Sequence, residues 1–220
     1  MNIHQTGLYH IYNRGNNQQR IFFMEENYTY FLQKCHRYLK PVSEILAWCL
    51  MPNHFHFLIE ATERSIEPIR SGGIAMPAIT NGFRLLQSSY AKGINKQESR
   101  NGNLFQQKTK AKLINGGEDD SLTVFYYIHH NPIKAGLSIT PEGWEYSSFK
   151  DYIGIRNVTL CNKQRCIDLL GLSVIDFKTE TLKVIDEEKW KEFFYRFSSG
   201  KKMCQTPFQA SDTILSAPLS

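Results

Sequence analysis

Membrane-spanning runs, a signal peptide and paired cysteines are missing from this 220-residue sequence. No stretch approaches the roughly 18 apolar residues of a transmembrane helix, and the polar start Met1–Thr6 lacks the apolar region of a signal peptide. The 5 cysteines are odd in number and form no Cys-x-x-Cys pair, which argues against a disulfide framework or a zinc knot. These absences predict a soluble protein of a reducing, intracellular compartment.

The composition supports a folded protein with a substantial core. Hydrophobic residues make up 41% of the chain and aromatic residues 13%, enough to build one domain with an appendage or two small domains. Lysine and arginine number 26 against 21 acidic residues, a net charge of +5. This excess of positive charge mildly favours a polyanionic partner.

The first half of the chain shows the order strand, helix, strand, strand, helix, strand. Alternating side chains predict strands at residues 8–12, 44–51, 54–60 and 104–114. Apolar residues at helical spacing predict helices at 26–39 and 77–95, and the Gly- and Ser-rich stretch 64–76 is expected to be a mobile loop. This order is that of a ferredoxin-like antiparallel sheet with helices on one face, so we predict an α+β fold.

Further helices are expected after this unit. One has the acidic residues 118–120 at its start, where they complement the helix dipole, and Ser121 as its cap; it runs to Asn131 and is stopped by Pro132. Two more are expected at 162–170, ending at Gly171, and at 186–199.

A histidine pair is the most distinctive motif of the expected sheet. In the run Met51–Glu60, side chains of a strand alternate, so His54 and His56 share one face. Two neighbouring imidazoles can chelate a metal ion, although half-buried histidines with ordinary hydrogen bonds would fit the same pattern. Glu60 shares that face but lies roughly 13 Å from His56 along an extended strand, too far to hold the same ion.

Four blocks occur in a fixed order along the chain: Tyr9–Asn16, Met51–His56, Tyr127–Leu137 and Trp144–Phe149. Together they resemble the single-tyrosine HUH transposases, the insertion-sequence-200-like family, and most of all its REP-associated branch. The resemblance spans about residues 7–153. It implies cleavage and rejoining of single-stranded DNA, at hairpin-flanked sites, by a cytoplasmic, nucleoid-associated protein that is a monomer or a homodimer.

The same resemblance implies roles for particular residues. The family's nucleophile falls on Tyr127, with Tyr126 as the obvious rival, and it attacks the phosphate to form a phosphotyrosine. His54 and His56 would hold a divalent metal, Mg²⁺ or Mn²⁺, and Asn131 stands where the family has its third ligand. An amide oxygen is an acceptable ligand for such a hard cation.

Helical geometry favours Tyr127 over Tyr126. Each residue advances about 100° around a helix, so Tyr127 and Asn131 lie on the same side. Tyr126 groups with the more core-like residues Phe125 and His129. A general base is not evident, and we assign no role to His130.

Residues that contact DNA are harder to place from sequence. The loop expected at 13–17 is polar, flexible and basic, and lysines alternate along the strand expected at 104–114. That lysine row fits either a solvated sheet edge or a phosphate-binding surface. The candidates, with Arg14 ranked first, are Asn13, Arg14, Arg84, Lys92, Lys108, Lys110 and Lys112.

We therefore divide the chain into an HUH nuclease domain at 1–153, a helical extension at 154–200 and a disordered tail at 201–220. Three functions are compatible with the sequence. The first is a metal-dependent transposase and single-strand nickase, and the second is a domesticated protein that binds DNA hairpins without cleaving them. The third is a metal-dependent hydrolase of another substrate, which would be indifferent to Tyr127.

Overall fold

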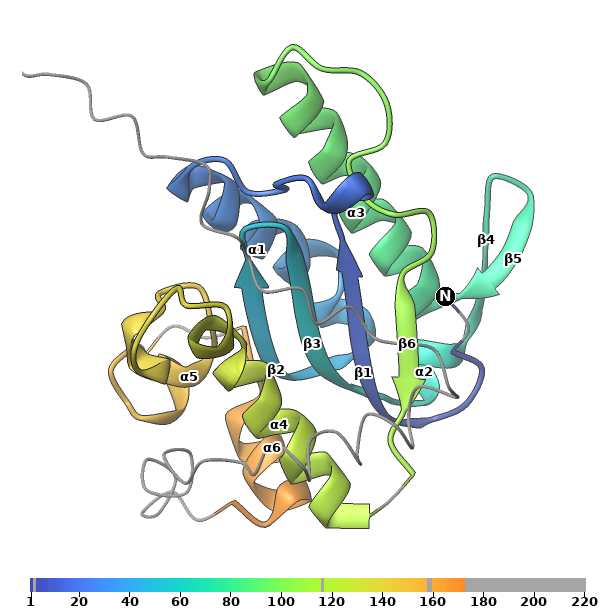
Figure 1. Ribbon diagram of the computed structural model, residues 1–220. Coiled ribbons are helices and arrows are strands. Elements are labelled where there is room, and N and C mark those ends of the chain that lie inside the picture. The colour runs from blue at the N-terminus through green and yellow to red at the C-terminus, as the bar shows by residue number, and fades with distance from the viewer. Residues whose placement is uncertain (2, 116, 158–159, 173–220) are drawn as a thin grey trace, which may run out of the picture.

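The computed structural model describes residues 1, 3–115, 117–157 and 160–172 (Figure 1). The helix expected at 186–199 and the tail at 201–220 lie outside these residues. Among the residues described, no helix combines the length and the apolar character needed to cross a membrane.

A 4-stranded antiparallel sheet lies at the centre of the fold, in the order β2-β3-β1-β6 (Figure 1). Its strands are β2 (Glu44–Met51), β3 (His54–Ala61), β1 (Gly7–Arg14) and β6 (Lys110–Leu113). The turn at Pro52 and Asn53 joins β2 to β3 as a hairpin, as expected. This is the strand order of a ferredoxin-like sheet, so the predicted α+β fold is confirmed.

Two long helices, α1 (Glu25–Tyr38) and α3 (Ala78–Gln97), pack on one face of this sheet. Phe55 and Phe57 of β3 point toward them and are fully buried. Phe83 of α3 contacts both rings, with centroids 6.4 and 6.0 Å away. Because alternate residues of a strand point to opposite faces, burying these phenylalanines presents His54 and His56 to the other face.

That other face is crossed by α4 (Gly117–Lys134), which packs on β2 and β3 (Figure 1). The acidic residues 118–120 lie at its start, as expected, but the expected cap and stop were wrong: Ser121 lies inside the helix, and the helix continues past Pro132. Pro132 lacks an amide hydrogen and weakens a helix interior, but the helix ends only two residues later, at Lys134. The helix therefore absorbs the proline in its last turn.

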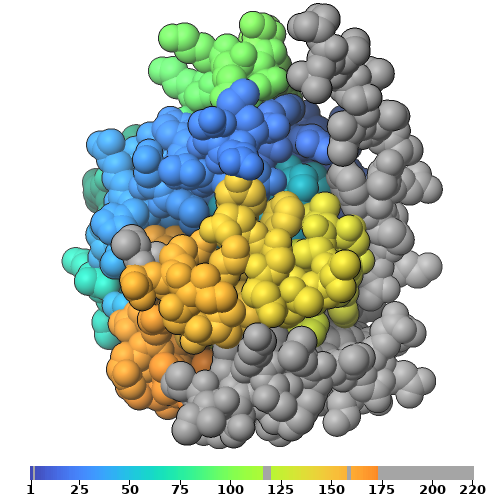
Figure 2. Space-filling model, turned by 90° about the vertical axis from the view of Figure 1, so that its left-hand side faces the viewer, coloured from blue at the N-terminus to red at the C-terminus, as the bar shows by residue number. Residues whose placement is uncertain are grey.

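The chain after α4 returns to the outer edge of β2. The segment before α5 (Phe149–Tyr152) pairs with that edge, where Leu50 donates its amide to Tyr146 and Ser148 donates its amide to Trp48. Then α6 (Lys163–Leu170) begins at the Asn162 cap and ends at Gly171 in a left-handed conformation, as predicted. Figure 2 shows these segments, in yellow and orange, packed against the blue amino-terminal part.

The loop expected at 64–76 and the strand expected at 104–114 both differ from the structure. The loop expected at 64–76 is largely ordered, with α2 (Glu63–Ile66) followed by a hairpin of β4 (Pro68–Ser71) and β5 (Ile74–Pro77). Gly72 and Gly73 both have positive φ and form its two-residue turn. The strand expected at 104–114 is confined to β6. Short 3-10 turns occur at Asn16–Gln18, Lys40–Val42 and Pro141–Gly143.

Candidate active site

Five polar side chains of β1 and β3 gather on the sheet face that α4 crosses. The register pairs Tyr12 with His56 and Arg14 with His54, and paired residues of antiparallel strands point to the same face. His10 lies two residues before Tyr12 and shares this face. His10 and His56 are buried, whereas His54, Tyr12 and Arg14 are half-buried.

Both histidines of the expected pair have one ring nitrogen engaged. His54 donates a hydrogen bond from Nδ1 to Asn53 Oδ1 over 2.6 Å. His56 Nδ1 lies 2.9 Å from Nε2 of His10, within hydrogen-bond distance. The His54 and His56 rings stand perpendicular with centroids 5.0 Å apart. The second nitrogen of each ring, Nε2, remains as the candidate metal ligand.

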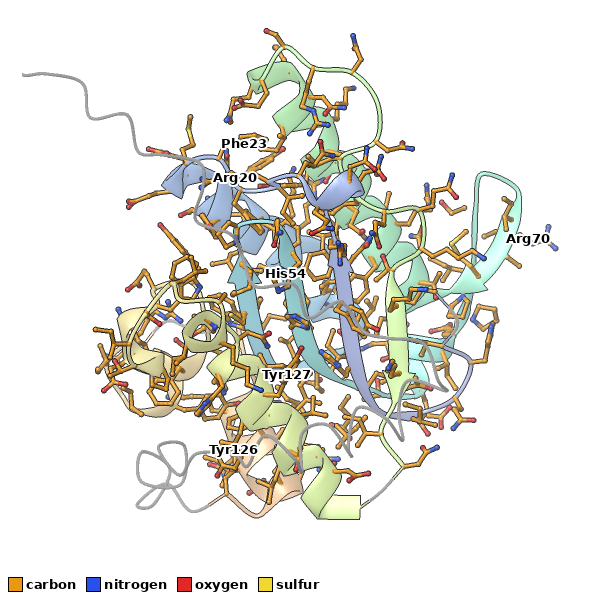
Figure 3. The ribbon with its side chains drawn as sticks, viewed as in Figure 1. Arg20, Phe23, His54, Arg70, Tyr126 and Tyr127 are labelled. Atoms are coloured by element: carbon orange, nitrogen blue, oxygen red, sulfur yellow. The ribbon has the colours of Figure 1, made fainter. Side chains whose placement is uncertain are left out.

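Tyr127 projects from α4 onto this histidine cluster (Figure 3). Its ring stands edge-on to His56 and to His10, with centroids 5.5 and 5.8 Å away. The ammonium of Lys134, two turns further along the helix, lies 5.9 Å from the centroid of the Tyr127 ring. The sequence-predicted tyrosine and histidines are therefore brought together by the packing of α4 on the sheet.

Asn131 lies one helical turn after Tyr127 and is buried. Its amide nitrogen donates to the Tyr127 carbonyl oxygen over 2.8 Å, which orients the side chain along the helix toward the tyrosine. Donation from Nδ2 leaves the Oδ1 oxygen as the atom available to a cation. Asn131 thus stays on the same helix side as Tyr127, as the 3.6-residue period requires.

Tyr126 and His129 face elsewhere. The Tyr126 ring contacts Phe125, at a centroid distance of 5.7 Å. His129 is fully buried and its Nε2 lies 2.8 Å from Ser148 Oγ, which in turn accepts the Trp48 amide. His129 therefore ties α4 to β2 and lies away from the tyrosine, as the helix geometry predicted.

Burial keeps the clustered histidines neutral. Desolvation and then the charge of Arg14 lower the pKa of His54 to about 4. Desolvation and then Lys112 lower the pKa of His10 to about 3, and desolvation, followed by His54 and His10, holds the pKa of His56 well below its usual range. Neutral imidazole is the form that binds metal ions, so near neutral pH these rings need lose no proton to bind one.

Burial also keeps the Tyr127 phenol neutral, but here the neutral form is the less reactive one. Burial, and then the neighbouring Tyr12 phenol, raise the pKa of Tyr127 above its ordinary value, whereas a hydrogen bond with the Asn131 side chain lowers it. At neutral pH Tyr127 is therefore protonated. Its oxygen can act as a nucleophile only if its proton leaves as it attacks, or if a nearby cation favours the phenolate.

The histidine arrangement suits a divalent cation. A metal-bound histidine typically donates its other ring N–H to a neighbouring acceptor, and His54 does so to Asn53. Glu60, set aside as a ligand from its spacing, is held instead by Arg165 of α6 through contacts of 2.6 and 2.8 Å. Among the residues described, no group of three His, Cys, Asp or Glu side chains forms a metal site. The expected set, two histidines with the Asn131 amide, stays a prediction.

The expected placement of Asn13 in a loop is corrected. It belongs to β1 and not to a loop, and it is buried with its amide bonded to Gln87, Gln106 and Thr109. Its Oδ1 accepts the Arg14 amide, so the whole side chain serves the internal structure. The following turn is also tight, because a Cβ at Gly15 would meet the Gln19 carbonyl oxygen at 2.1 Å.

The remaining basic candidates fall on two sides of the sheet. Cross-strand pairing places Lys110 beside Tyr12 and Lys112 beside His10, so both share the face of the histidines. Arg84 and Lys92 are exposed on α3, which covers the opposite face, and Arg84 bonds to Ser71 and Asn81. The exposed residue Lys108 precedes β6 and so does not extend the alternation.

Sequence reasoning missed three residues of this site: His10 and Tyr12 of the sheet, and Lys134 of α4. The alternation of His10 and Tyr12 in their strand was a signal for a shared face. Pairing that face with His56 required the register between β1 and β3, which the local sequence does not contain. Lys134 lay beyond the expected end of its helix at Pro132.

A ferredoxin-like sheet that sets a His-x-His strand against a helix tyrosine resembles the single-tyrosine HUH transposases, and sequence comparison confirms that resemblance. A curated Haemophilus influenzae protein with the provisional name REP-associated tyrosine transposase is 26% identical over 129 residues, 58% of this chain and 69% of that protein. No protein-family profile matches the chain.

One solved structure supports the fold. The structure of a REP-associated tyrosine transposase bound to a REP hairpin aligns with a TM-score of 0.54 and 15% identity, covering 72% of this chain and 86% of that one. A protein of Deinococcus radiodurans R1, provisionally described as a transposase, aligns more weakly, with a TM-score of 0.36 and 15% identity over 58% of this chain and 93% of that one.

Proposed function

We propose that this protein is a metal-dependent transposase and nickase of single-stranded DNA, which cleaves and rejoins DNA through Tyr127. The observation that carries the proposal is the position of Tyr127, edge-on to both His56 and His10 with centroids 5.5 and 5.8 Å away. A nucleophile and a candidate metal site from distant parts of the chain thus meet on one sheet face. A metal-dependent hydrolase without a protein nucleophile would not need this tyrosine.

In this proposal, His54, His56 and Asn131 hold Mg²⁺ or Mn²⁺, which neutralises charge on the scissile phosphate when bound. The Tyr127 oxygen attacks the phosphorus, its proton is released, and the bond from phosphorus to the DNA 3′ oxygen breaks. The 3′ oxygen takes up a proton and leaves as a hydroxyl. The family resemblance supplies this polarity, in which the tyrosine retains the 5′ phosphate.

A phenol is a far better leaving group than an alkyl alcohol, because its pKa is near 10. A DNA 3′ hydroxyl can therefore attack the phosphotyrosine, reform the phosphodiester and return Tyr127 without consuming ATP. Cleavage and joining are then one reversible exchange. This property suits a protein that moves DNA more than one that degrades it.

The proposed substrate is a DNA hairpin with single-stranded flanks. The solved relative is described as bound to a REP hairpin, and the net charge of +5 favours a polyanion. Arg14, Lys110 and Lys112 supply positive charge on the face that carries the histidines. We place the protein's action in the cytoplasm, at the nucleoid.

The test is a covalent trap with end-labelled hairpins that carry randomised single-stranded flanks, incubated with protein and Mn²⁺ and resolved under denaturing conditions. We expect a denaturant-resistant adduct with the wild-type protein and with Tyr126→Phe, and none with Tyr127→Phe. Tyr126 is a matched control because it is the adjacent, half-buried tyrosine that contacts Phe125.

Two outcomes would contradict the proposal in different ways. A normal adduct yield with Tyr127→Phe would show that another group is the nucleophile. Salt-sensitive hairpin binding without any adduct in Mn²⁺ would favour the domesticated binding protein.

A further inference from the structure

His10 is a buried histidine to which the proposed chemistry gives no role. It comes from β1, where it lies diagonally across from His56 on the neighbouring strand. Only 3% of His10 and 4% of His56 is exposed, and their rings are nearly parallel with centroids 5.1 Å apart. Nε2 of His10 and Nδ1 of His56 are separated by 2.9 Å.

Only one hydrogen can occupy the space between these two nitrogens, which leaves two arrangements of neutral rings. If His10 donates, His56 carries its hydrogen on Nε2 and that nitrogen has no lone pair for a cation. If His56 donates from Nδ1, its Nε2 is unprotonated and can bind a cation. The direction of this hydrogen bond therefore decides whether His56 can act as a ligand through Nε2.

His54 offers an internal comparison. Asn53 donates its amide nitrogen to the Gln18 carbonyl, so its Oδ1 oxygen faces His54 and can only accept. His54 consequently carries its hydrogen on Nδ1 and a lone pair on Nε2. An equivalent acceptor beside His56 would give both rings of the pair the same tautomer, and His10 is the group that contacts that nitrogen.

We propose that His10 is a positioning residue for the metal site, which accepts the hydrogen of His56 Nδ1 and so holds His56 Nε2 ready to bind a divalent cation. This inference rests on the proposed function, because it assigns a supporting group to that metal site. It predicts that His10 can be replaced by another acceptor of similar reach but not by an apolar ring.

The experiment measures Mn²⁺ affinity by calorimetry in the full-length chain, without DNA. His10→Phe keeps a planar ring but cannot accept a hydrogen bond, and we expect it to weaken Mn²⁺ binding about 10- to 100-fold. His10→Gln presents a carbonyl oxygen near the position of Nε2 and should recover most of the affinity. His36→Phe, which removes an exposed histidine of α1, should bind as the wild type does.

A second measurement reads the hydrogen directly. Nitrogen NMR of the metal-free wild-type protein should show His56 with its hydrogen on Nδ1, a result that a purely structural role for His10 does not demand. Thermal unfolding without metal identifies any variant that fails to fold. If His10→Phe does not fold, the tautomer of His56 in the wild-type protein still tests whether His10 accepts its hydrogen bond.

The outcomes separate this inference from the proposed function. A wild-type protein that binds no Mn²⁺ overturns both the metal site and the role of His10. Normal Mn²⁺ binding in wild type and in folded His10→Phe overturns only the role of His10. An NMR result that places the hydrogen of His56 on Nε2 in the metal-free wild-type protein also overturns only the role of His10.

Discussion

The ring of Tyr127 stands edge-on to the ring of His56, with the two centroids 5.5 Å apart and the ring planes inclined by 82°. The contact joins a helix residue to a residue of a central strand and depends on α4 packing across β2 and β3. A phenol held against neutral, buried imidazoles lies in surroundings of low polarity, which oppose its ionisation. This relationship gives the proposed reaction a distinct pH dependence.

We expect the rate of adduct formation to rise with pH. Burial raises the pKa of Tyr127 above its ordinary value. At pH values below this pKa, the fraction of Tyr127 in the reactive phenolate form grows tenfold for each pH unit. With saturating Mn²⁺, single-turnover rates should increase about tenfold per unit between about pH 6 and 8. Quenched time courses on labelled hairpin DNA measure this, with Tyr126→Phe giving the same profile. A flat profile would mean that Tyr127 ionisation does not limit the reaction.

Removing the metal should abolish cleavage and spare binding. Chelation with EDTA is expected to eliminate the adduct, because a bound cation contributes several kcal/mol to stabilising the charged transition state. Hairpin affinity should change little, since lysine and arginine contacts to phosphate need no metal. Adduct gels and filter binding on the same samples test both statements.

Replacing either histidine of the pair tests whether these two side chains hold the metal. His54→Ala and His56→Ala should each reduce adduct formation by at least about 100-fold at a fixed Mn²⁺ concentration. The exposed residue His36 provides the control, and His36→Phe should leave the yield unchanged. Full adduct yield after exhaustive chelation, or in both alanine variants, would refute a metal held by this pair.

The local pattern of the sequence predicted much of the fold and, within the site, the relative positions of residues that belong to the same strand or helix. Strand alternation placed His54 and His56 on one face, and helical spacing placed Tyr127 with Asn131 and apart from Tyr126. These statements need only one element at a time. The structure confirms the shared strand face and the position of Tyr127 beside the histidines.

Features that depend on two distant segments were missed. Asn13 was expected in an exposed loop because Asn-rich runs favour turns, yet its amide bonds to Gln87 and Thr109, far along the chain. His10 likewise became part of the site only through the register of β1 on β3. Such pairings are set by tertiary packing and leave little trace in either segment alone.

DNA affinity should depend on which face of the sheet carries a lysine. Lys110 is exposed on the face of the histidines, whereas Lys92 is exposed on α3, on the opposite face. We expect Lys110→Gln to weaken hairpin binding and to reduce the slope of log affinity against log salt by about 0.7 to 0.9. Both variants lose the same charge, so Lys92→Gln controls for net charge and should change neither quantity. Equal losses in the two variants, measured by fluorescence anisotropy across a salt series, would contradict a DNA path over the histidine face.

His129 should make the stability of the protein depend on pH. It is fully buried, and desolvation followed by the charge of His130 lowers its pKa from 6.5 to about 3. Below about pH 6.5 the unfolded chain therefore binds a proton that the folded chain excludes. The free energy of unfolding should be greatest above this pH and fall on acidification, by up to about 1.4 kcal/mol per pH unit for each such histidine.

His129→Gln isolates this contribution, because an amide can still bond to Ser148 but takes up no proton. We expect the variant to be less stable at pH 7, since it loses the ring contact with Phe125 at 4.6 Å. Its stability should nevertheless fall less steeply, by about one proton, between about pH 6 and 4. His10 and His54 also have lowered pKa values, so some pH dependence persists in the variant. Urea unfolding at a series of pH values in EDTA provides the comparison, and parallel curves for the two proteins would mean that His129 is protonated in the folded state as readily as in the unfolded one.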